Sequence, residues 1–123
     1  MNEEIKAQWL AALRSGEYQQ GHSWLRTGDS YCCLGILCEL HRKATGKGEW
    51  SKCEIFTYRV ETWASSTNLP TPVSEWAEVD YHNPIIQGIT LATYNDGEEG
   101  DEDDAPIRPH TFAEIADLID RYL

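Results

Sequence analysis

The chain lacks any apolar run that approaches the roughly 18 residues of a membrane-spanning helix. Its first residues, Met1-Asn2-Glu3-Glu4, are acidic, whereas a secretory signal begins with basic residues. Four cysteines without such a signal are not typical of an extracellular disulfide framework. We therefore expect a cytoplasmic protein with free thiols and no membrane contact.

Positive charge is also scarce, with 10 Lys and Arg against 21 Asp and Glu and a net charge of −11. Seven of these acids lie between positions 96 and 104, and the remaining 14 against 10 basic residues leave a net charge of −4. Direct binding to nucleic acid is disfavoured, because no basic patch is present to neutralise phosphates.

The acidic segment instead predicts contact with a protein that has a basic surface. The predicted contact residues are Glu98, Glu99, Asp101, Glu102, Asp103 and Asp104. A loop that only keeps the protein soluble explains the same charges equally well.

The length of 123 residues suits one domain, and a hydrophobic content of 41% with five Trp supplies a core. Amphipathic spacing predicts a helix over 3–15, and a capping box at Thr111 and Glu114 predicts another over 111–122. β-Branched and aromatic residues predict one strand over 53–63, whereas 89–94 fits either a strand or a short helix.

A third helix is predicted by the apolar block Tyr31-Cys32-Cys33-Leu34-Gly35-Ile36-Leu37-Cys38, which follows a polar turn over 27–30. This helix is too apolar for the surface, and it extends to about Lys43. Glycine inside a helix costs about 1 kcal/mol relative to alanine, so we expect another backbone to approach Gly35 closely.

These elements together predict a single α+β domain over residues 1–123. The helix from the cysteine block is central, and the terminal helices pack with it beside a small, mainly antiparallel sheet. The acidic segment over 96–106 is predicted to be a mobile loop.

The cysteines of this block have two interpretations. A thiolate of Cys32 or Cys33 at the helix start would be stabilised by unpaired amides, as a cysteine-dependent hydrolase or transferase requires. Candidate bases and orienting groups follow later in the chain: His82, His110, Asn95 and Asp96. This order of residues arises easily by chance, and free cysteine is among the most buried residue types, so core packing is the favoured interpretation.

Metal and small-molecule sites have weaker support. Cys38 and His41 share one helix face and Cys53 follows, but a structural zinc site needs four ligands, and no pair of closely spaced cysteines forms a knuckle. We therefore favour no metal and no cofactor. A pocket for a nucleotide or another small molecule has no support beyond the aromatic content.

Three segments give the chain a distinctive pattern. They are the block 31–38, the segment Leu91-x-x-x-Asn95-Asp96, and the terminal sequence Thr111-Phe112-x-Glu114-Ile115-Ala116-Asp117-x-Ile119. Together with the first helix, this pattern resembles a group of small uncharacterised proteins of bacteriophages and prophages. The resemblance implies a phage-type origin and supplies no catalytic residues. The acidic stretch 98–104 is longer than the connection usual in that group.

The two marked blocks also predict a contact. We expect the side chain of Asn95 or Asp96 to bind the free amides at the start of the cysteine helix.

The predicted function is that of a small cytoplasmic accessory protein of phage type. It would bind a host or phage protein with a basic surface, for example to inhibit a host nucleic-acid-handling or defence factor. The alternative is the cysteine-dependent enzyme described above.

Overall fold

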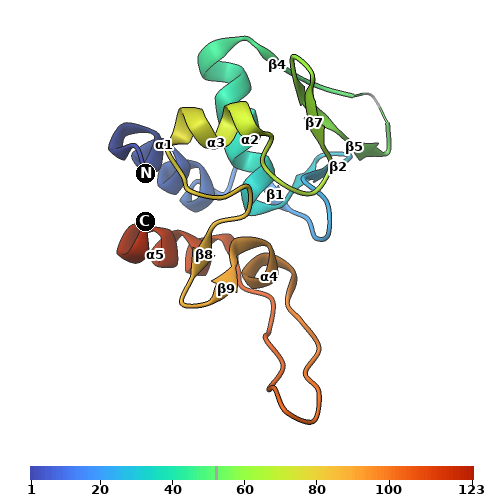
Figure 1. The fold of residues 1–123 in the computed structure, drawn as a ribbon, viewed down its shortest axis with the longest axis vertical. Coiled ribbons are helices and arrows are strands. Elements are labelled where there is room, and N and C mark those ends of the chain that lie inside the picture. Colours follow the sequence, from blue (N-terminus) through green and yellow to red (C-terminus); the bar gives the residue numbers. More distant parts are fainter. Residues whose placement is uncertain (52) are drawn as a thin grey trace.

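The computed structural model describes residues 1–51 and 53–123, and its elements follow the chain as drawn in Figure 1. The helices are α1 (Glu3–Arg14), α2 (Cys33–Thr45), α3 (Thr71–Ala77), α4 (Leu91–Asp96) and α5 (Phe112–Tyr122). The strands are β1 (Gln19–Gln20), β2 (Arg26–Thr27), β3 (Ser30–Tyr31), β4 (Gly48–Trp50), β5 (Ile55–Phe56), β6 (Tyr58–Val60), β7 (Trp63–Ser65), β8 (Ile85–Ile86) and β9 (Ile89–Thr90).

Helix α2 lies at the centre and contacts α1, α3 and α4 (Figure 1). Its residues from Cys33 to Glu39 are all buried, as the apolar block predicts. The helix begins after Cys32, whose Sγ accepts a hydrogen bond from the amide of Gly35, and it ends at Gly46 in the left-handed conformation. The predicted central helix is therefore confirmed.

The close approach expected at Gly35 is also present. A Cβ at this position would collide with the carbonyl oxygen of Leu25 and lie 2.7 Å from its carbonyl carbon. The same carbonyl oxygen accepts the amide of Cys32 at 3.1 Å, so the segment before β2 is bound to the start of α2.

The two terminal helices pack against each other beside α2. Helix α1 buries Ile5, Trp9 and Leu13 on one face, and the indole N–H of Trp9 donates to the carbonyl of Cys33 at 3.0 Å. Helix α5 begins with the capping box between Thr111 and Glu114. Both helices are confirmed nearly to their predicted ends.

The strands form three small sheets that are mainly antiparallel. Their orders are β1-β3-β2-β5, β4-β6-β7 and β8-β9, and only the pair β1-β3 is parallel among the described residues. The α+β class with small, mainly antiparallel sheets is therefore correct.

The single strand predicted over 53–63 is wrong. Ile55–Phe56 pairs with β2, Tyr58–Val60 pairs with β4 in another sheet, and Trp63 begins β7 after a tight turn. Glu61 makes this turn with a φ of 57°, although nothing in its side chain favours the left-handed region.

Segment 89–94 contains both of the structures left open by its sequence, since β9 leads directly into α4. Asn95 and Asp96 are the last residues of α4, and Gly97 closes the helix with a φ of 78°. None of the described helices is long and apolar enough to span a bilayer.

Candidate functional site

Residues 97–109 project from the body between α4 and α5 and are here called the acidic arm (Figure 1). Its two legs are joined by backbone hydrogen bonds of 2.8 and 2.9 Å between Glu98 and Ile107. A Cβ at Gly97 would lie 2.8 Å from Cδ of Pro109, so this close packing of the legs requires glycine.

The tip of the arm is closed by its own side chains. Oδ1 of Asp101 accepts the amides of Asp103 and Asp104 at 2.9 and 2.7 Å, and the amide of Asp101 donates to the carbonyl of Asp104 at 2.9 Å. These bonds define the conformation of the tip, whereas the predicted mobility of the segment stays a prediction.

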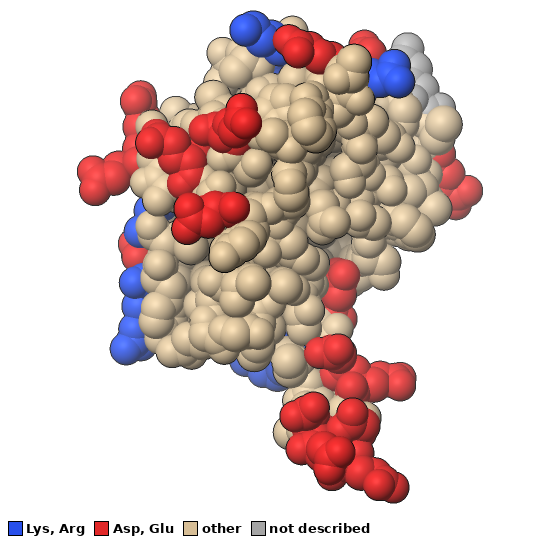
Figure 2. Space-filling view, viewed as in Figure 1, with Lys and Arg blue, Asp and Glu red and all other residues tan. Residues whose placement is uncertain are grey.

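The arm carries six exposed carboxylates, which form the projecting acidic patch in Figure 2. They are Glu98, Glu99, Asp101, Glu102, Asp103 and Asp104. The backbone hydrogen bonds at the tip lower the pKa of Asp101, which favours its charged form. At the root of the arm, Arg108 forms a two-point ion pair with Glu114 of α5, so this cation is already engaged.

The root of the arm is bound to the core through Asp96 and Asn95. Asp96 Oδ1 accepts the amide of Ser23 at 3.0 Å and the side-chain amide of Asn95 at 2.8 Å. Asn95 is fully buried, and its Oδ1 accepts the amide of Cys33 at 3.2 Å and the side-chain amide of Gln20 at 3.1 Å. The predicted contact between the two marked blocks is therefore confirmed, and Asn95 provides it.

The cysteine block contains no activated thiol. Cys32, Cys33 and Cys38 are buried free cysteines, and Cys53 is exposed. Burial raises the pKa of Cys32 to about 11 and raises that of Cys33 well above its ordinary value. Desolvation thus outweighs the amides at the helix start, which is the opposite of what a nucleophilic thiolate requires.

The two candidate bases, His82 and His110, form their hydrogen bonds elsewhere in the structure. His82 is exposed and its Nδ1 bonds to the carbonyl of Leu69, while Nδ1 of His110 bonds to the carbonyl of Arg108. Within the described residues, no hydrogen bond joins either ring to a cysteine. Of these candidates, Asn95 bonds to the cysteine block and Asp96 lies near Cys32 and Cys33, whereas neither histidine bonds to the block among the described residues.

The three residues considered as metal ligands lie in different environments. Cys38 is completely buried, His41 bonds to the hydroxyl of Tyr58 at 2.8 Å, and Cys53 is exposed. The described part of the chain contains no cluster of three His, Cys, Asp or Glu side chains suited to a metal.

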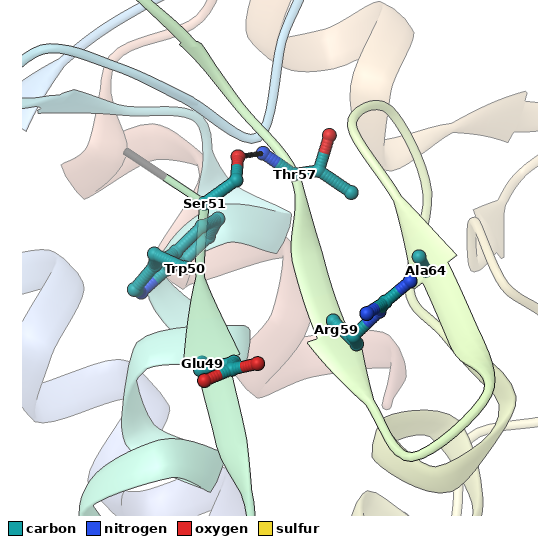
Figure 3. Close-up of a pocket in the computed structure, with 6 residues that line it drawn as sticks. All are labelled: Glu49, Trp50, Ser51, Thr57, Arg59 and Ala64. Carbon is teal, nitrogen blue, oxygen red and sulfur yellow. Dashed lines mark hydrogen bonds between the residues drawn. The ribbon is translucent and has the colours of Figure 1, made fainter. Parts of the chain in front are cut away.

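One surface hollow, of about 350 Å³, lies on the outer face of the sheet β4-β6-β7 (Figure 3). Glu49 and Arg59 occupy paired positions on β4 and β6, and Ser51 Oγ accepts the amide of Thr57 at 2.8 Å. Opposite charges at paired positions offset each other. The polar groups of this hollow therefore pair with one another within the sheet.

A second hollow, of about 540 Å³, lies between the end of α2, the β6–β7 turn and α3. Its walls include His41, Trp63 and Trp76. This hollow could not be predicted from the sequence, because its residues come from three separate elements and only the high aromatic content pointed to a pocket.

A comparison with known protein families found a match that covers the whole chain. The family model described as "Domain of unknown function (DUF8296)" matches residues 1–123. The chain is therefore a single α+β domain that belongs to this family. No curated protein and no solved structure matches it.

Proposed function

We propose that the protein acts by binding another protein through the acidic arm, and that the partner presents a basic surface. The observation that supports this proposal is the presentation of six carboxylates on an arm with defined backbone hydrogen bonds, held away from the body (Figure 2). A segment that only improved solubility would not need closed legs or a capped tip.

Preorganisation makes such an arm a better ligand than a flexible acidic tail. Because its backbone is already ordered by hydrogen bonds, little further conformational entropy is lost when it binds. Charges concentrated at one end of the molecule also steer a basic partner toward that end and accelerate association.

The resemblance to phage and prophage proteins narrows the proposed partner to a protein of the phage or its host. A nucleic-acid-handling or defence factor fits this chemistry, because its phosphate-binding surface is basic and the arm can compete electrostatically for it. Under this proposal the protein is an accessory protein of phage type that acts in the cytoplasm.

The test is affinity capture from lysate of the natural host, with and without phage infection, followed by mass spectrometry. An arm-neutral variant carries Gln or Asn at the six arm positions and should lose the captured protein. Its fold should be unchanged, because no buried group is altered.

A body-neutral variant supplies the matched control for net charge. It carries the same six charge-removing changes at exposed acids outside the arm that make no side-chain hydrogen bond within the described residues: Glu4, Glu17, Asp29, Glu49, Glu54 and Asp80. Capture should persist in this variant. Equal loss in both variants, or no loss in the arm-neutral one, would contradict binding through the arm.

A further inference from the structure

The hollow between α2, the β6–β7 turn and α3 lies at the opposite end of the molecule from the acidic arm (Figure 1). Its volume of about 540 Å³ is within the range of small-molecule sites. Two tryptophans and charged side chains of both signs line it. These features are independent of the arm and of the function proposed for it.

The wall of the hollow includes a histidine that uses only one of its two ring nitrogens within the described residues. His41 is 3% exposed, and its Nδ1 lies 2.8 Å from the hydroxyl of Tyr58. The second ring nitrogen, Nε2, has no hydrogen-bond partner among the described residues. No side-chain nitrogen or oxygen of the described residues is both buried and without a partner, so the unbonded Nε2 is not itself buried. Because the ring forms part of the wall, Nε2 is available to a molecule in the hollow.

The tautomer of His41 follows from the burial of Tyr58. Tyr58 is fully buried, and its hydroxyl has no partner other than His41 in the described part of the chain. If Nδ1 carried the proton, the hydroxyl hydrogen of Tyr58 would be left without an acceptor. The hydroxyl therefore donates to Nδ1, and the proton of the neutral imidazole is on Nε2, which is a hydrogen-bond donor.

Two further effects keep His41 neutral. Burial and the nearby charge of Lys47 lower the pKa of His41, while burial raises the pKa of Tyr58. The hollow therefore offers one fixed N–H donor, which suits a carbonyl oxygen rather than a cation.

The tryptophans supply flat apolar surfaces beside this donor. Trp63 is 48% exposed, so about half of its indole is open to a ligand. Trp76 is half-buried, and its ring lies edge-on to His41 with centroids 5.2 Å apart. A nucleic-acid base stacks favourably on an aromatic side chain of this kind, whatever its sequence identity.

The charged side chains limit the chemistry of the occupant. Lys47 and Glu61 lie next to the paired residues Gly48 and Val60 and bring one charge of each sign to the hollow. Glu75 then leaves an acceptor and a negative charge at the rim. A ring N–H or amino group fits beside this carboxylate, whereas a phosphate is repelled.

We propose that this hollow binds a small planar heteroaromatic molecule of nucleobase type, stacked on Trp63 and accepting a hydrogen bond from Nε2 of His41. The carbonyl of the ring faces His41, and a ring N–H or amino group faces Glu75. The same base could come from a free nucleoside or from a nucleotide, and the carboxylates at the hollow favour the uncharged nucleoside.

The test is two-dimensional NMR of the ¹⁵N-labelled protein, read at the indole N–H signals of Trp63 and Trp76. Guanosine and uridine, which carry ring carbonyls, should shift both signals saturably with a Kd of about 1 mM or tighter. Guanosine 5′-monophosphate should bind more weakly than guanosine. Trp63→Ala should abolish saturation, whereas Trp24→Ala, which removes a 37% exposed indole outside the hollow, should leave it unchanged.

Three results would overturn the proposal. They are the absence of a saturable shift with either nucleoside, unchanged binding in Trp63→Ala, and equally tight binding of indole, which is planar but has no carbonyl. Since Trp63 is exposed, its replacement leaves the core intact, and the dispersion of the remaining amide signals checks this directly.

Discussion

Replacing Asn95 tests the junction that joins the acidic arm to the core. Asn95→Ala leaves the buried amide of Cys33 without an acceptor, because this amide belongs to the first turn of α2 and has no partner within the helix. Gln20 keeps its bond to the carbonyl of His110, and Asp96 keeps its bond to Ser23. One unsatisfied buried donor costs about 1–3 kcal/mol, and the lost hydrogen bonds add about 1 kcal/mol.

We therefore expect Asn95→Ala to lower the free energy of unfolding by about 2–4 kcal/mol in urea titrations at neutral pH, with an unchanged m-value. Asn68→Ala is the matched control. Asn68 is exposed and its side chain makes no hydrogen bond within the described residues, so its replacement should cost less than about 0.5 kcal/mol. A cost for Asn95→Ala as small as that of the control would refute the reasoning.

Two other substitutions and one labelling experiment test separate parts of the structure. Gly35→Ala should destabilise the fold by at least about 2 kcal/mol in the same titration, because the new Cβ collides with the carbonyl of Leu25. Glu114 has its pKa lowered to about 2 by the Arg108 side chain and then by backbone hydrogen bonding. Its contribution is therefore complete above the unfolded pKa of about 4.3 and is lost as pH falls toward 2. The midpoint of thermal unfolding of Glu114→Gln should accordingly be lower than that of wild type at pH 6. The two midpoints should converge near pH 2. Among the four thiols, only Cys53 should react rapidly with a disulfide reagent in the native state.

Each of these changes has its own control. Gly46→Ala also adds a methyl group, but nothing lies within 4 Å of it, so only the left-handed φ should cost about 1 kcal/mol. A parallel pH series with Asp117→Asn, another ion-paired acid of α5, distinguishes a specific effect of Glu114 from a general charge effect. Cys53→Ser should remove the fast thiol phase, and a second fast thiol in that variant would contradict the burial of the cysteine block.

The helices could be predicted because their signals are local. The face formed by Ile5, Trp9 and Leu13 and the capping pair of Thr111 and Glu114 each lie within one element. The interior Gly35 was informative for the same reason, since an unfavourable residue in an apolar helix indicates a close neighbour.

The strand error has a physical explanation. The run over 53–63 is rich in β-branched and aromatic residues throughout. It also contains no glycine, proline or asparagine that would mark a turn. The chain nevertheless turns at Glu61, because Val60 and Trp63 must pair with each other across two antiparallel strands. Tertiary pairing outweighed local preference at this position.

The candidate sites also differ in how far their sequence signals are local. The acidic arm is one continuous segment, so its charge was visible in the sequence, whereas its closed legs depend on the pairing of Glu98 with Ile107. The hollow at His41 could not be predicted, because Trp63 and Trp76 reach it from separate elements. The junction at Asn95 was predicted only because two distinctive blocks were assumed to meet.

The most direct test of the account is the salt dependence of affinity between this protein and the partner captured through it. Six surface charge pairs at about 0.2–1 kcal/mol each sum to about 1–6 kcal/mol, so the arm-neutral variant should bind between about 10-fold and 10⁴-fold more weakly at low salt. Raising the ionic strength should weaken wild-type binding and narrow this difference, while the body-neutral variant should follow wild type. Equal affinities of wild type and the arm-neutral variant at low salt would contradict the proposal that the acidic arm binds the partner.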